Sequence, residues 1–192
     1  MIAVRSWERA KGLTRIEFVA GVRALADYRR ANKSARDIAA LFSTGRDDAP
    51  ALASHMIEEN KELHRRIRVL SEVAAKVEAH ELFNETGPSA NGTRIVSKVF
   101  QDRDADALKK LAQALITNSH TIALLASRDQ ETARLVFARS ADAAGDMNQL
   151  MRKACEILDG RGGGKPELAQ GGGKNLAKLD EALRTILSEL TQ

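Results

Sequence analysis

A chain of 192 residues can bury a core of its own, and 43% hydrophobic with 29% charged residues is the usual balance of a soluble protein. The single cysteine, Cys155, excludes an internal disulfide framework, and together with only four histidines it excludes a cysteine-rich zinc module. The apolar runs are too short to cross a bilayer and the N-terminus lacks a signal-peptide layout, so we expect a cytoplasmic protein without membrane contact.

The positive charge is concentrated at the N-terminus. The formal net charge is +4, yet residues 1–36 alone hold nine Lys or Arg against three Asp or Glu. These cations would give a sequence-independent attraction to nucleic-acid phosphates, and the same pattern also fits a solvated basic face.

Residues 1–21 alternate short apolar pieces around a polar turn, which predicts two strands. Residues 22–85 change to helical periodicity, with Ser34 as the expected N-cap of a first helix and a long helix running from beyond Pro50 to about Leu82. The long helix repeats apolar residues at heptad spacing. It therefore fits either a coiled coil between two chains or an antiparallel hairpin with the preceding helix, the arrangement that we favour.

Turn-forming residues from Phe83 to Gly92 predict a boundary, after which residues 92–192 form a second domain. Its expected elements are strand 93–100, helix 104–118, strands 121–126 and 134–139, helix 146–158 and a closing helix from about Asn175. The uniformly apolar strand 121–126 should be central in a mixed sheet. The fold class is therefore α+β, with an α/β-like C-terminal domain preceded by a helical hairpin or coiled-coil linker.

The segment 159–175 holds more than half of the 13 glycines, and we interpret it as one anion-binding loop. Glycine permits positive φ and close approach of backbone N–H groups, and the helix expected near Asn175 would add the positive end of its dipole. A flexible linker is the alternative. The candidate phosphate- or nucleic-acid-binding residues are Arg161, Gly162, Gly163, Gly164, Lys165, Gln170, Gly171, Gly172, Gly173 and Lys174.

The glycine segment also carries a family resemblance. GRGGGKPELAQGGG resembles the signature of the DHH-associated domain that closes alanyl-tRNA synthetases and the long alanyl-tRNA editing proteins. The likeness extends through TRIVSKVF and TIALLASRDQETARLVFARSAD to TRIEFVAG, which is similar to the last strand of the editing domain. It implies that residues 1–21 are the end of an editing domain.

This resemblance implies a tRNA-binding module of an alanyl-tRNA editing or synthetase-related protein, with tRNA(Ala) as the expected partner and a homodimer formed through the helical linker. Two alternatives remain open. One is the phosphate-binding lobe of a DHH-type phosphoesterase that acts with a separate catalytic lobe, and the other is a dimerisation module.

The resemblance also bears on catalysis. Hydrolysis of mischarged tRNA in the editing proteins uses a zinc site built from an HxxxH pair and a CxxxH pair, and this sequence has neither pair. It also lacks the Asp-His-His motif of the phosphoesterases. We therefore expect no catalytic residues, metal or cofactor in this chain, with zinc belonging only to an upstream editing domain.

The first prediction follows from this lack of zinc ligands. The purified chain should leave Ser-tRNA(Ala) intact in a deacylation assay with added zinc. Hydrolysis above the no-protein background that disappears on chelation would contradict it.

Overall fold

The computed structural model describes residues 1–89 and 91–191, so Ala90 in the expected boundary segment and Gln192 at the end of the expected second domain lie outside the described residues. The chain forms two compact units, Met1–Arg65 and Arg66–Gln192. No helix among the described residues is both long and apolar enough to span a membrane.

The first unit begins with the two predicted strands. β1 (Ile2–Ala10) and β2 (Leu13–Ala20) pair antiparallel across a tight turn in which Lys11 and Gly12 both have positive φ. Such a turn matches the right-handed twist of the flanking strands. One face of this hairpin is apolar and exposed, and it consists of Ile2, Val4, Trp7, Ile16 and Phe18.

Two helices follow the hairpin, α1 (Val22–Leu41) and α2 (Ala49–Glu85). The expectation that Ser34 caps a short helix is wrong, because the helix-forming residues before it extend α1 back to Gly21. α2 ends at Glu85, which moves the start of the boundary segment from Phe83 to Thr86.

α1 and the part of α2 that belongs to the first unit do not pack as an antiparallel hairpin. The apolar heptad residues of α2 remain exposed, among them Met56, Leu63, Ile67, Leu70 and Val77. The hairpin arrangement that we favoured is therefore not what the structure shows. Within the described residues these heptad side chains are at least half exposed.

The second unit is built on a five-stranded sheet in the order β3-β4-β5-β7-β6. Its strands are β3 (Arg94–Gln101), β4 (Thr121–Arg128), β5 (Ala133–Arg139), β6 (Arg161–Lys165) and β7 (Leu168–Gly173). Only β3 and β4 run parallel, and the other neighbours are antiparallel, so the predicted mixed sheet is confirmed. β4 is buried along nearly its whole length, as its uniformly apolar sequence predicts.

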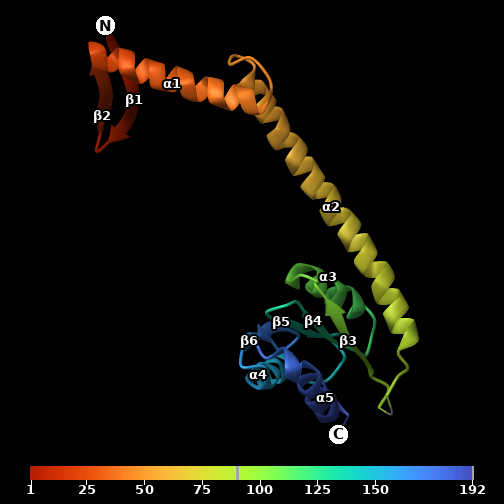
Figure 1. Cartoon of the computed structure of the whole chain (residues 1–192). Coiled ribbons are helices and arrows are strands. Elements are labelled where there is room, and N and C mark those ends of the chain that lie inside the picture. The colour runs from red at the N-terminus through yellow and green to blue at the C-terminus, as the bar shows by residue number, and fades with distance from the viewer. Residues whose placement is uncertain (90, 192) are drawn as a thin grey trace. The chain divides into compact units, whose positions relative to one another are not determined.

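Helices cover both faces of this sheet (Figure 1). α3 (Ala105–Leu115) lies on one side, which we call the α3 face, and α4 (Met147–Ile157) with α5 (Leu179–Leu190) lies on the other, the α4 face. Asp104 and Asp146 cap α3 and α4 by accepting hydrogen bonds from backbone N–H groups of the first turn. Phe137 on β5 is fully buried in the core between the sheet and α4 and α5.

Candidate nucleic-acid interface

The glycine-rich segment is a β-hairpin and not a loop. β6 and β7 pair in register from Arg161 with Gly172 to Lys165 with Leu168, and Pro166 and Glu167 form the two-residue connection. β7 also pairs with β5, so this hairpin completes the main sheet. The prediction of a single loop is therefore wrong, because these glycines are drawn into strand pairing.

The backbone of the hairpin also differs from the expected anion nest. None of the glycines between residues 160 and 173 has positive φ. Strand N–H groups point along the sheet toward neighbouring strands, and on β6 the Gly164 N–H donates to Oδ1 of Asn148 at 3.0 Å. The backbone N–H groups of this segment therefore do not converge on one point, as an anion-binding loop would require.

Strand alternation divides the nine candidate residues that lie in β6 and β7 into two groups, and the tenth, Lys174, follows β7. Gly162, Gly164, Gly171 and Gly173 share the α4 face with buried Ala169. A Cβ atom built on Gly162 would lie 2.7 Å from Sγ of Cys155 and 2.9 Å from Cγ of Met151, both on α4. One on Gly171 would lie 2.5 Å from the same sulfur. On this face the glycines allow α4 to rest directly on the strand backbone.

Cys155 belongs to this contact. It is buried, and burial raises the pKa of its thiol. A thiol held in the neutral form between a helix and two glycine strands acts as a small apolar side chain. Its position therefore favours a core residue over a nucleophile.

The α3 face of the hairpin is open and basic. Alternation places Arg161, Lys165 and Gln170 there, and all three are exposed. Gly163 pairs with Gln170 and also faces this side, where a Cβ would meet only Asn148 Oδ1, at 3.3 Å. α3 packs on β4 and β5, so this part of the sheet is left uncovered. We call Arg161, Gly163, Lys165 and Gln170 the basic hairpin face.

Arg134 is a further cation that sequence reasoning missed. The register places Arg134 of β5, Gly172 of β7 and Arg161 of β6 in one row across the α3 face. Period-two alternation shows which side of β5 Arg134 occupies. Only the strand order β5-β7-β6 brings it into the same row as Arg161, with Gly172 between them. No local signal in the sequence gives that order.

Asp129 fixes the position of Arg134. Its carboxylate lies 2.7 Å from Nη2 of Arg134. The backbone N–H groups of Glu131 and Thr132 donate to the same carboxylate at 2.8 and 2.7 Å, and together with Arg134 they lower the pKa of Asp129 to about 2. Asp129 is thus ionised at neutral pH and holds the guanidinium at the end of the sheet.

A shallow hollow lies beside this row. Its floor is mainly glycine backbone, and Arg134 and Lys174 contribute cations to its lining. Asp159 also lines it and accepts a hydrogen bond from Nδ2 of Asn175 at 3.0 Å. Of the candidate cations, Arg161 and Lys165 lie on the basic hairpin face, whereas Lys174 follows β7 at the hollow.

The helix after the hairpin does not begin where we expected. Residues Leu176–Lys178 form a 3-10 turn, and α5 starts only at Leu179. Asp180 and Glu181 occupy its first turn and offset the positive end of the helix dipole. Asn175 instead donates its backbone N–H to the carbonyl of Leu158, just after α4. The proposed dipole contribution to an anion site is therefore wrong.

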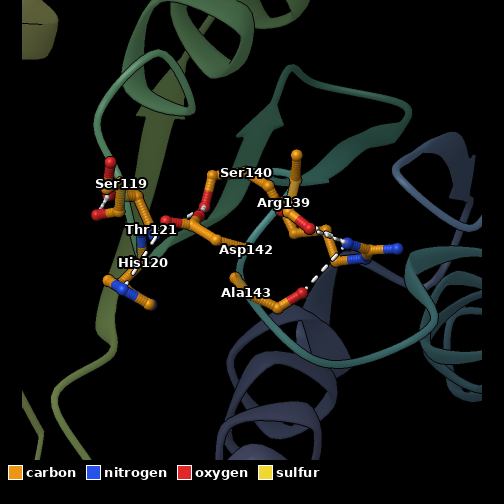
Figure 2. A network of polar contacts seen from close by, with 8 residues as sticks. Ser119, His120, Thr121, Arg139, Ser140, Asp142 and Ala143 are labelled. Carbon is orange, nitrogen blue, oxygen red and sulfur yellow. Dashed lines mark hydrogen bonds and ion pairs between the residues drawn. The ribbon is translucent and has the colours of Figure 1, made fainter.

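A polar network lies at the opposite end of the sheet (Figure 2). Oδ1 of Asp142 accepts from the Ser140 hydroxyl at 2.5 Å and from the His120 backbone N–H at 2.9 Å, which lowers the pKa of Asp142 to about 2. The His120 imidazole is 3.6 Å from the same carboxylate. Because the serine donates to the aspartate and not to the histidine, this is not the order of a catalytic triad. It fixes the loop after β5, helped by Arg139, which donates to the carbonyl of Ala143 at 2.9 Å.

Within residues 1–89 and 91–191, no cluster of three or more His, Cys, Asp or Glu side chains is arranged to hold a metal ion. The three histidines of α2 stay apart from one another along the helix. The candidate site is thus defined by cations, one amide side chain and glycine backbone.

Comparison with known proteins identifies the protein family to which this chain belongs. Residues 91–192 match the DHHA1 domain model, and the chain belongs to this family. It is 31% identical over 177 residues to an alanine–tRNA ligase from Pseudomonas entomophila and 30% identical over 175 residues to one from Methanosarcina barkeri. These matches cover 91% and 90% of this chain but 20% and 19% of the ligases, so the chain spans about one fifth of their length.

A solved structure supports the same relationship. The C-Ala domain from Aquifex aeolicus alanyl-tRNA synthetase superposes with a TM-score of 0.51 at 26% identity, over 55% of this chain and 96% of that domain. The resemblance drawn from the glycine-rich signature is confirmed, and so is the mixed α/β fold behind a long helix.

Proposed function

We propose that this chain is a non-catalytic tRNA-binding module and that the basic hairpin face contacts the RNA. One observation carries the proposal: alternation turns Arg161, Lys165 and Gln170 to the open side of the sheet and leaves only glycine between them. A flat surface with separated cations suits a phosphate backbone, and Gln170 can hydrogen-bond a sugar or a base edge.

The relatives support the choice of tRNA over other polyanions. The matched ligases and the superposed domain are proteins named for alanine and tRNA, which makes tRNA(Ala) the first species to test. With tRNA as its partner, the protein would act in the cytoplasm. Arg134 and Lys174 would extend the contact toward the hollow at the end of the sheet.

The second prediction tests this face by charge removal. Arg161→Gln with Lys165→Gln should weaken tRNA binding and flatten the log-log dependence of affinity on salt by about 1.8, because each lost phosphate contact removes a little under one. Fluorescence anisotropy across a salt series measures both quantities. Lys110→Gln with Lys153→Gln is the matched control, since both lysines are paired with acids on α3 and α5. Equal slopes in all three proteins would contradict the proposal.

Gly163→Val probes the same face without a charge change. A Cβ there would meet only the side-chain oxygen of Asn148, at 3.3 Å, and a small shift of that side chain relieves the contact, so the fold should persist. A branched side chain would nevertheless stand between the two cations and hold RNA away. We expect it to weaken binding more than either single charge removal. Wild-type affinity in a folded Gly163→Val protein would mean that RNA does not approach this backbone.

We also propose that the chain dimerises through α2. The observation that favours this second function is the exposed heptad surface of α2, on which Leu63 is 50%, Ile67 58% and Leu70 68% exposed. Exposure of apolar side chains to water is unfavourable, and at heptad spacing a second helix can bury them.

A further inference from the structure

α1 carries a set of cations with no acidic partner. Arg29, Lys33 and Arg36 recur at spacings of four and three, so they share one side of the helix over roughly 10 Å. Arg23 and Arg30 lie beside them, seven residues apart. All five are exposed. We call Arg29, Lys33 and Arg36 the α1 basic stripe.

Elsewhere in the same unit most lysines and arginines are paired, and Arg9 and Lys11 are the exceptions among the described residues. Arg5 contacts Glu17 at 3.0 Å and Asp27 at 3.4 Å, and Arg15 contacts Glu8 at 3.2 Å. On α2, Lys61 and Arg65 pair with acids one turn earlier. Among the described residues, the five α1 cations form no ion pair. The excess charge of the first 36 residues is therefore largely the charge of this helix.

Helix stability does not explain the stripe. Like charges three and four residues apart repel each other and disfavour the helix that carries them. The only two acids in α1 are Asp27, which pairs with Arg5, and Asp37. An unneutralised stripe of this kind is relieved by an anionic partner.

The rest of α1 favours a nucleic acid over a membrane surface. A helix that lies in a membrane needs a continuous face of bulky apolar residues. The two buried residues of α1 are Ala24 and Ala39. Its larger exposed apolar side chains, Val22, Leu25, Tyr28, Ile38 and Leu41, lie toward its two ends, and no bulky apolar residue stands between Tyr28 and Ile38 to make the face continuous.

We propose that the α1 basic stripe is a second RNA-contacting surface, which binds the phosphate backbone independently of sequence. It lies in the first unit, and the basic hairpin face lies in the second. This proposal rests on the proposed function only for the class of ligand, RNA, and separate variants test the two surfaces.

The third prediction concerns the triple variant Arg29→Gln, Lys33→Gln, Arg36→Gln. Its tRNA affinity at low salt should fall on the order of tenfold, and the log-log salt slope should flatten by about 2.7. The melting temperature should stay the same or rise, because glutamine forms helix about as well as arginine and the repulsion is gone. A stripe with a purely structural role would instead lower the melting temperature and leave the slope unchanged.

The matched control is Arg15→Gln, Lys61→Gln, Arg65→Gln, which removes the same charge from paired positions of the same unit. If this control loses as much tRNA affinity as the stripe variant, net charge alone explains the effect and the proposal is overturned. Unchanged RNA binding together with stripe-dependent binding to phosphatidylserine vesicles would also overturn it. If Arg161→Gln with Lys165→Gln leaves the slope unchanged while the stripe variant lowers it, the hairpin proposal fails and this one stands.

Discussion

Gly162→Ala should melt roughly 10 °C below the wild type, from a loss of about 3 kcal/mol in the free energy of unfolding. The added methyl group would lie 2.7 Å from Sγ of Cys155 and 2.8 Å from Cα of Gly171, and neither the buried thiol nor the paired backbone can move away freely. α4 would have to separate from the hairpin. Differential scanning calorimetry of the two proteins measures the change.

Gly163→Ala is the control for this prediction, since it adds the same methyl group to the neighbouring residue on the open face. Its melting temperature should lie within a few degrees of the wild type. Equal melting of both variants would show that α4 does not rest on the glycine backbone. The pair also separates stability from binding, because the residue that tolerates a side chain is the one expected to affect RNA contact.

Leu70→Lys should convert a dimeric protein into a monomer. If the exposed heptad residues of α2 meet those of a second chain, the substitution buries an unpaired ammonium group in an apolar contact, which costs several kcal/mol in each half of a symmetric interface. Multi-angle light scattering at micromolar concentration gives the mass directly, and the wild type should show twice the mass of the 20.9 kDa chain.

Ser54→Lys is the comparison for this effect. It adds the same charge to the same helix on the side away from Leu63 and Leu70, so the dimer should survive. A monomeric wild type at high micromolar concentration would exclude the α2 contact, and a variant dimer as stable as the wild type would place the interface elsewhere.

Most of the second unit could be predicted from side-chain periodicity. The uniformly apolar 121–126 segment indicated an interior strand buried on both faces, although β5 and not β4 is the middle strand of the five. Asp104 and Asp146 marked the starts of two helices whose apolar residues recur at intervals of three and four residues. These patterns are local and reflect burial of one helical side or of both strand faces.

The hairpin could not be found in this way, because β6 and β7 consist largely of glycine and carry too few side chains to show a period of two. Their pairing depends on β5, which is remote in sequence, and on the contact with α4, which the glycines themselves do not signal. The same remoteness hid Arg134 from the candidate site. In α1, Ser34 resembled a cap only because nothing local revealed that the helix continues on both sides of it.

The position of β7 between β5 and β6 restricts how this family can vary in length. Removing one residue from β7 would exchange its two sides, which would turn Gln170 toward Cys155 and Ala169 toward solvent. Removing two residues would keep the sides but shorten the ladder. Natural insertions and deletions should therefore collect at Pro166 and Glu167 or after Gly173, and those within β7 should come in even numbers.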